Sequence, residues 1–176
     1  MSVAPPPLII NLLLGSLPRQ ERDRVMAHCE PVELHFGKVL CEPDRPFRYL
    51  YFPVSGFISL VTTLGSHRPL ELALIGNEGM LGATQVLGVN SAPSRAVVQG
   101  TGSALRISPL KLREALLECP RLLRTLKRYL YVLMVQLSQN VACGHFHEVE
   151  PRLARWLLMS HDRAHSDHLQ LTHEYL

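Results

Sequence analysis

Apolar and polar residues alternate with a period of two between residues 32 and 108, and this alternation predicts a series of short β-strands. The alternating segments are separated by glycine, proline or asparagine at intervals of roughly ten residues. The predicted strands are 32–36, 49–52, 54–63, 70–75, 95–99 and 103–107. Short strands at this spacing are typical of an antiparallel sandwich, roll or barrel.

Ser108 and Pro109 mark the change from strands to helices. Ser108 is a favourable N-cap and Pro109 suits the first helical position, so we expect a short helix over 109–118 and a longer one from Pro120. Six apolar residues then recur at alternating spacings of four and three, as the a and d positions of a coiled coil do. They are Cys119, Leu123, Leu126, Leu130, Leu133 and Leu137.

Two interpretations of this stripe remain open. An amphipathic helix that packs only on its own sheet would carry such a stripe. The spacing persists for nearly three heptads, however, and Tyr129, Val132 and Met134 widen the apolar surface beside it. We therefore favour a homodimer of parallel helices. Its predicted interface is Leu123, Leu126, Leu130, Leu133 and Leu137.

The last quarter of the chain has the pattern of a second helical unit. We expect Pro151 to end or bend the long helix and Leu153 to begin another, which carries the sole tryptophan. A polar loop is predicted over 161–168, and Thr172 is a favourable cap for a new helix. Because that helix would have only five residues, too few for a stable one, we expect the sequence to stop inside a second domain.

These elements predict an α+β fold: an antiparallel, jelly-roll-like β-roll with flanking helices. We divide the chain into a lead-in with a short helix (1–31), a β-roll (32–108), a short and a long helix (109–149) and the beginning of a second domain (150–176).

Composition narrows the class of protein. The chain is 47% hydrophobic and 19% charged, which supports a packed core and argues against disorder. No apolar run is long enough to span a membrane. The N-terminus has no basic segment before its apolar stretch, so we expect no secretory signal and a cytoplasmic chain. The net charge of +3 permits nucleic-acid contact without requiring it.

Catalytic and metal chemistry are not indicated. The sequence has no G-x-S-x-G, no H-E-x-x-H and no G-K-[ST] motif. Its four cysteines stand far apart. His161, His165 and His168 have a spacing that suits metal ligands on a helix, but their polar neighbours favour a solvated loop. We expect neither an enzyme nor a metal site.

The most informative local sequence is the glycine-rich interval GNEGMLG at 76–82, followed by PSRA at 93–96. Glycines let backbone N–H groups approach an anion, and an arginine entering the next strand can pair with a phosphate. A plain strand–turn–strand with Arg95 on the surface would account for the same residues. The candidate pocket residues are Gly79, Met80, Leu81, Gly82, Ser94, Arg95 and Ala96.

In this order, the elements resemble the Crp/Fnr family of bacterial transcription regulators. The resemblance is carried by FPVSGFI at 52–58, GMLG at 79–82, SRA at 94–96, EPRLARWL at 150–157 and LTHEYL at 171–176. It implies a β-roll of the cyclic-nucleotide-binding type, a dimerisation helix and a winged helix-turn-helix. It also implies promoter DNA and RNA polymerase as partners, with Thr172 and His173 as contacts to the DNA backbone.

The resemblance also bears on the effector. In the family's cyclic-AMP binders, a glutamate after the loop glycine receives the ribose hydroxyl, and an Arg-Ser pair holds the cyclic phosphate. Here Met80, a weak acceptor, takes the glutamate's place, and the pair reads Ser94-Arg95. We therefore do not expect tight cyclic-AMP binding, and the effector stays open. The alternative function is a stand-alone ligand- or protein-binding sensor or scaffold that does not bind DNA.

Overall fold

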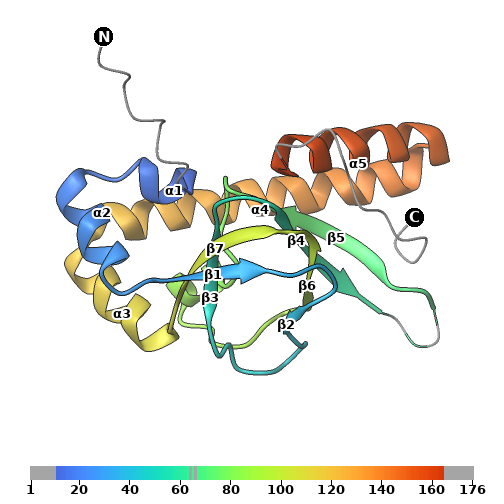
Figure 1. Ribbon diagram of the computed structural model, residues 1–176. Helices are drawn as coiled ribbons and strands as arrows, with labels where there is room; N and C mark the ends of the chain where they lie inside the picture. Colours follow the sequence, from blue (N-terminus) through green and yellow to red (C-terminus); the bar gives the residue numbers. More distant parts are fainter. Residues whose placement is uncertain (1–10, 64, 66, 165–176) are drawn as a thin grey trace, which may run out of the picture.

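Two antiparallel sheets form a β-roll in the computed structural model, which describes residues 11–63, 65 and 67–164 (Figure 1). One sheet has the order β1-β7-β3 and the other the order β2-β6-β4-β5. The strands are β1 (Glu30–Leu34), β2 (Val39–Cys41), β3 (Leu50–Pro53), β4 (Phe57–Thr62), β5 (Leu70–Ile75), β6 (Arg95–Gly100) and β7 (Gly102–Ile107). The predicted α+β roll is confirmed.

Strand β2 is the element that the sequence pattern missed. It has three residues, too few to show alternation, and it is held by pairing with β6, where Val39 lies opposite Val97. Each of the six predicted segments overlaps a strand, although β1 begins at Glu30, before the predicted boundary at residue 32.

Helices surround the roll. They are α1 (Leu12–Gly15), α2 (Arg19–Met26), the 3-10 helix η1 (Ala83–Leu87), α3 (Pro109–Glu118), α4 (Pro120–Phe146) and α5 (Val149–Ala164). The Ser108 hydroxyl accepts from the Lys111 N–H at 3.3 Å, as an N-cap should. Within the described residues, no helix combines the length and the apolar character needed to cross a bilayer.

The boundary between the last two helices differs from the prediction. α4 ends at Phe146 and α5 begins at Val149, so the break precedes Pro151. Proline is tolerated in a first helical turn, where its missing N–H would have no helical partner. α5 also continues to Ala164, so the first residues of the predicted polar loop are helical.

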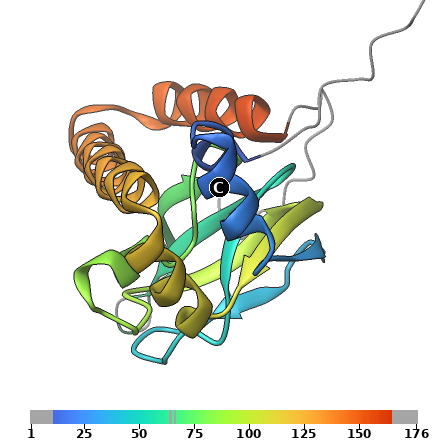
Figure 2. The same ribbon diagram turned by 90° about the vertical axis from the view of Figure 1, so that its left-hand side faces the viewer.

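Helix α4 lies along the roll, and α5 turns back beside it over the sheets (Figures 1 and 2). The inward side of α4 buries Leu122, Leu126 and Tyr129. These side chains join a continuous core with residues from both sheets, such as Phe52 and Ile58. The long helix is therefore packed into the core of the roll rather than forming a separate stalk.

Candidate functional site

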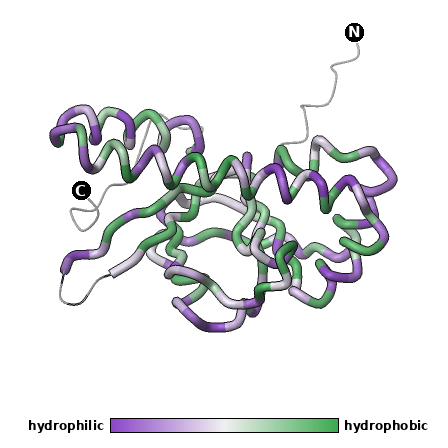
Figure 3. Tube along the Cα trace, turned by 180° about the vertical axis from the view of Figure 1, so that it is seen from behind, coloured by the Kyte–Doolittle hydropathy of each residue, from purple (hydrophilic) through white to green (hydrophobic). Residues whose placement is uncertain are grey.

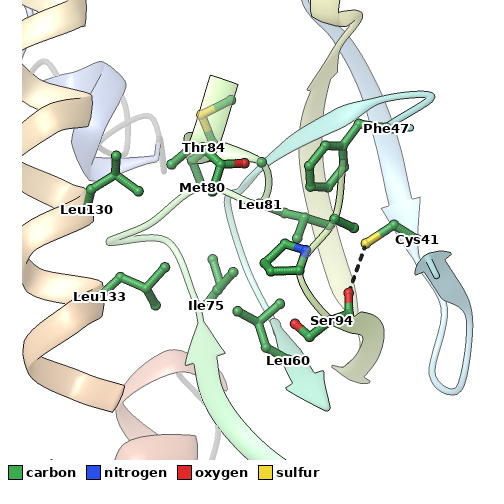
Figure 4. Close-up of a pocket in the computed structure, with 14 residues that line it drawn as sticks. Cys41, Phe47, Leu60, Ile75, Met80, Leu81, Thr84, Ser94, Leu130 and Leu133 are labelled. Atoms are coloured by element: carbon green, nitrogen blue, oxygen red, sulfur yellow. Dashed lines mark hydrogen bonds between the residues drawn. The ribbon is translucent and has the colours of Figure 1, made fainter. Parts of the chain in front are cut away.

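A small apolar cavity of about 30 Å³ lies where the roll, η1 and α4 meet (Figure 4). The residues that line it are Cys41, Phe47, Leu60, Ile75, Met80, Leu81, Gly82, Ala83, Thr84, Ala92, Pro93, Ser94, Leu130 and Leu133. Nearly all are apolar, so the cavity suits an uncharged group rather than an anion.

The glycine-rich loop is held against the roll by backbone bonds. Leu81 and Tyr51 exchange two N–H···O bonds, at 2.8 and 3.2 Å. Gly82 then adopts a φ of 91° and leads into η1. The Leu50 side chain occupies the space that a Cβ atom on Gly82 would fill, so only glycine fits this turn. This geometry brings Met80 and Leu81 to the cavity.

Three side chains give the cavity its polar groups. Among the described residues, none forms a hydrogen bond with the buried Oγ1 of Thr84. The Cys41 thiol donates to the Ser94 carbonyl at 3.8 Å. Burial raises the pKa of Cys41 to about 11, so this thiol is neutral at physiological pH. Ser94 itself is almost fully buried.

Arg95 points away from the cavity. Its Nε and Nη2 donate to the two carboxylate oxygens of Glu42 at 2.9 and 2.8 Å, a bidentate pair on the surface. This bonding lowers the pKa of Glu42. Successive residues of a strand face opposite sides, which separates Arg95 from Ser94. In this arrangement, none of the described residues that line the cavity carries a positive charge to hold a phosphate.

The structure brings together four of the seven predicted pocket residues: Met80, Leu81, Gly82 and Ser94 line the cavity. Ala96 instead lies fully buried in the core. Gly79 contacts the Tyr129 hydroxyl rather than the cavity. Together with Arg95, these two residues are not among those that line this cavity, and their part in a ligand site stays a prediction.

The predicted interface residues of α4 divide between two roles. Leu126 is fully buried in the chain's own core and is unavailable to a partner helix. Leu130 and Leu133 line the cavity, and Leu137 packs against the core. Leu123 is half-buried. The stripe predicted from the sequence therefore points largely inward.

The outward apolar surface of α4 is displaced from that stripe. Met134 is 64% exposed and Val141 is 74% exposed. Each follows by four residues a leucine, Leu130 or Leu137, that packs against the roll. Figure 3 shows apolar and polar residues mixed along the length of α4. Because α4 buries Leu126 against its own roll, the exposed side chains of Met134 and Val141 are left for a partner helix.

Sequence reasoning missed several lining residues. Thr84 lies in the interval between the two motifs, where no local pattern singled it out, and Phe47 lies in a loop. Leu130 and Leu133 were identified, but as interface residues. Of the three histidines with the spacing of metal ligands, His161 lies exposed on α5. Thr172, His173, His165 and His168 lie outside the described residues.

The family model of the cyclic nucleotide-binding domain matches residues 31–119. No curated protein sequence matches.

Several solved structures share the fold. The c-di-GMP-responsive global regulator CLP of Xanthomonas campestris is 18% identical over 80% of this chain and 71% of its own, with a TM-score of 0.66. The Thermus thermophilus catabolite activator protein is 19% identical over 76% of this chain and 63% of its own, with a TM-score of 0.61. A protein assigned to the Crp/Fnr regulators, from Eubacterium rectale, is 11% identical over 92% of this chain and 76% of its own, with a TM-score of 0.69. At these levels of sequence identity, the similarity shows that the proteins share a fold.

Proposed function

Because the chain belongs to the cyclic nucleotide-binding domain family, we propose that it acts as a transcription regulator of the Crp/Fnr type whose β-roll senses a small-molecule effector. One observation carries the sensing part: the cavity is walled on one side by Leu130 and Leu133 of α4. A ligand there touches the roll and the helix together, so its binding shifts the packing of α4 on the roll. The protein is not an enzyme on this proposal.

The effector that fits this cavity is small, uncharged and largely apolar. Apolar side chains dominate the lining, and Thr84 offers one hydroxyl that can donate or accept a hydrogen bond. Cyclic AMP is a poor match on two counts. Met80 supplies no strong acceptor for a ribose hydroxyl, and Arg95 is bonded to Glu42 on the outer surface.

In this proposal, the outward face of α4 passes the effect of ligand binding on to the DNA-binding part by joining two copies of the chain. Met134 and Val141 present apolar surface that a second copy of the chain would cover. The proposed assembly is therefore a homodimer through α4, acting on promoter DNA in the cytoplasm with RNA polymerase as a further partner. In this arrangement, the part that contacts DNA comes after the roll and α4 in the sequence, and residues 150–176 would be its beginning.

Thermal unfolding with cyclic AMP tests the ligand class. A ligand at about 100 times its dissociation constant stabilises a protein by about 2.7 kcal/mol. We expect no such stabilisation at millimolar cyclic AMP, for the chain or for an Arg95→Ala variant. A melting shift at micromolar nucleotide that Arg95→Ala abolishes would show that Arg95 turns inward and that the proposed effector class is wrong.

DNA binding is tested separately. The protein, expressed from its whole coding sequence, is mixed with sheared genomic DNA of its own source, and the bound fragments are sequenced. A common motif among them supports the regulator. Recovery of fragments in proportion to the input would instead favour a stand-alone sensor or scaffold.

A further inference from the structure

Helix α5 docks on the roll through one polar face. Trp156, Ser160 and Arg163 are spaced by four and three residues, so they lie on the same side of the helix. Ser160 is fully buried, whereas Leu158 is 67% exposed on the other side. Figure 2 shows α5 lying across the sheets rather than projecting from them. The docked face therefore carries polar groups as well as the indole ring of Trp156, and Leu158 points outward.

The centre of the contact is a buried carboxylate. Glu71 of β5 accepts a hydrogen bond from Trp156 Nε1 at 2.8 Å through one oxygen. Its other oxygen accepts from the Ser59 hydroxyl of β4 at 2.6 Å. Ser59 follows the core residue Ile58 on its strand, so it faces the opposite side of the sheet, where α5 lies. Glu71 thus bridges the sheet and the helix.

A second carboxylate holds the C-terminal end of α5. Arg163 Nε and Nη2 both lie 2.8 Å from Oε1 of Glu78, in the loop after β5. A Cβ atom on Gly76 would lie 2.5 Å from Cγ of Arg163, so glycine is needed for this approach. Arg155 also donates to Asn140 of α4, whose amide donates to the Leu72 carbonyl at 2.7 Å.

We propose that these contacts form a releasable latch: Glu71 and Glu78 hold α5 against the β4–β5 sheet, and loss of the two contacts frees the helix from the roll. This regulatory device goes beyond effector sensing and does not depend on which ligand occupies the cavity. Its partner is this chain's own α5. The latch is releasable because its hydrogen bonds and its ion pair join desolvated polar groups, and water can take the place of each partner.

Protonation of Glu71 is linked to the latch. Burial raises the pKa of Glu71 from 4.5 to about 7, against the smaller lowering effects of Ser59, Trp156 and Arg163. Arg163 is the charged residue of α5 that lowers the pKa of Glu71. Ser59 of β4 is uncharged, and α4 meets the neighbouring part of β5 with the uncharged Gln136 and Asn140.

The direction of the effect follows from that pKa. In the docked state the carboxyl binds its proton more tightly than it does when exposed to water. Raising the pH through neutrality therefore places a charge on a buried group and weakens docking. Lowering the pH favours the docked helix. A carboxyl oxygen can accept from Trp156 in either protonation state, so the latch does not require the charge.

The chain contains one tryptophan, and it is the latch residue itself. Its emission maximum and its quenching by acrylamide report docking directly. For the wild type, we expect a red shift and about a twofold rise in the quenching constant as the pH rises from about 5 to about 8. Glu71→Gln keeps the shape and an acceptor oxygen, so it should stay blue-shifted at both pH values.

Two further variants complete the test. Arg163→Gln leaves the partly buried Glu78 carboxylate without its charged partner, so it should show the red-shifted, more quenched emission already at about pH 6, with the far-UV circular dichroism of the folded chain. Glu30→Gln, which removes an exposed carboxylate paired with Arg106 on the other sheet, should behave as the wild type does. Histidine titration is present in every variant, so the same pH response in Glu71→Gln would overturn the proton linkage. Unchanged quenching in Arg163→Gln would overturn the latch.

Discussion

The hydroxyl of Tyr129, on α4, lies in the space that a Cβ atom on Gly79 would fill. Tyr129 is almost fully buried, and burial raises its pKa well above the ordinary value. The neutral phenol therefore inserts between the helix and the loop that carries Met80. Through this contact, the position of the cavity loop and the position of α4 depend on each other.

Gly79→Ala should lower the free energy of unfolding by roughly 1–3 kcal/mol, because the added methyl collides with the Tyr129 ring and forces the core to shift. Urea denaturation followed by circular dichroism measures it. Gly144→Ala is the matched control: nothing lies within 4 Å of the added atom, and alanine favours a helix interior by roughly 0.5–1 kcal/mol. Equal stabilities for the two variants would contradict the packing described.

Asn11 is a second point at which distant elements are joined. It is fully buried, and its amide donates to the carbonyls of Pro53 and Gly79 at 2.9 and 2.8 Å. Asn11→Asp removes both donors and places a carboxylate against two carbonyl oxygens, so we expect a loss of roughly 1–3 kcal/mol or more. Thermal unfolding measures this loss.

The control for Asn11 is the same substitution at an exposed site. Asn90 accepts a hydrogen bond from Gln85 at 2.6 Å, and an aspartate there keeps an acceptor oxygen. Asn90→Asp should therefore leave the melting temperature nearly unchanged. A comparable loss in both variants would mean that the two donated bonds of Asn11 contribute little.

We expect the proposed homodimer to form through the outward face of α4. Met134→Lys combined with Val141→Lys should give monomers in sedimentation velocity without unfolding the chain, because both side chains are exposed. Leu117→Lys, at an 88% exposed position on α3, should leave the dimer intact. A double variant that still sediments as a dimer would place the interface elsewhere.

Leu126→Ala separates the two roles of α4. This side chain is fully buried in the roll's own core, so its truncation should cost about 2–5 kcal/mol of folding free energy. The assembly state of the folded fraction should not change. Loss of the dimer with full stability would instead restore Leu126 to the interface.

The stability of the folded chain should depend on pH through Glu71. Its pKa is raised from 4.5 to about 7 in the folded state, so the folded chain binds the proton more tightly than the unfolded chain does. This contribution is complete below about pH 4.5 and is lost as the pH rises to about 7. The loss is on the order of 3 kcal/mol at most, at about 1.4 kcal/mol per pKa unit. Urea denaturation of Glu71→Gln across this range should lack that slope.

Local pattern alone determined six of the seven strands, the cap of α3 at Ser108 and the start of α4 at Pro120. These depend on side-chain periodicity and capping, which act within a few residues along the chain. The same patterns singled out the glycine-rich loop, three residues of which line the cavity. A strand of three residues such as β2 exists only by pairing with β6, so no local signal could show it.

Only the tertiary structure decided which way each side chain points and which distant residues it meets. The spacing of Leu126 and Met134 does not say which of them faces the roll, because that depends on how α4 rotates to bury its larger apolar side. Arg95 lies next to Ser94 in sequence, but Ser94 lines the cavity and the Arg95 side chain bonds to Glu42 on the surface. Glu71 and Trp156 are 85 residues apart and carry no shared motif. They come into contact in the folded chain, where both polar groups lose water and the hydrogen bond between them replaces it.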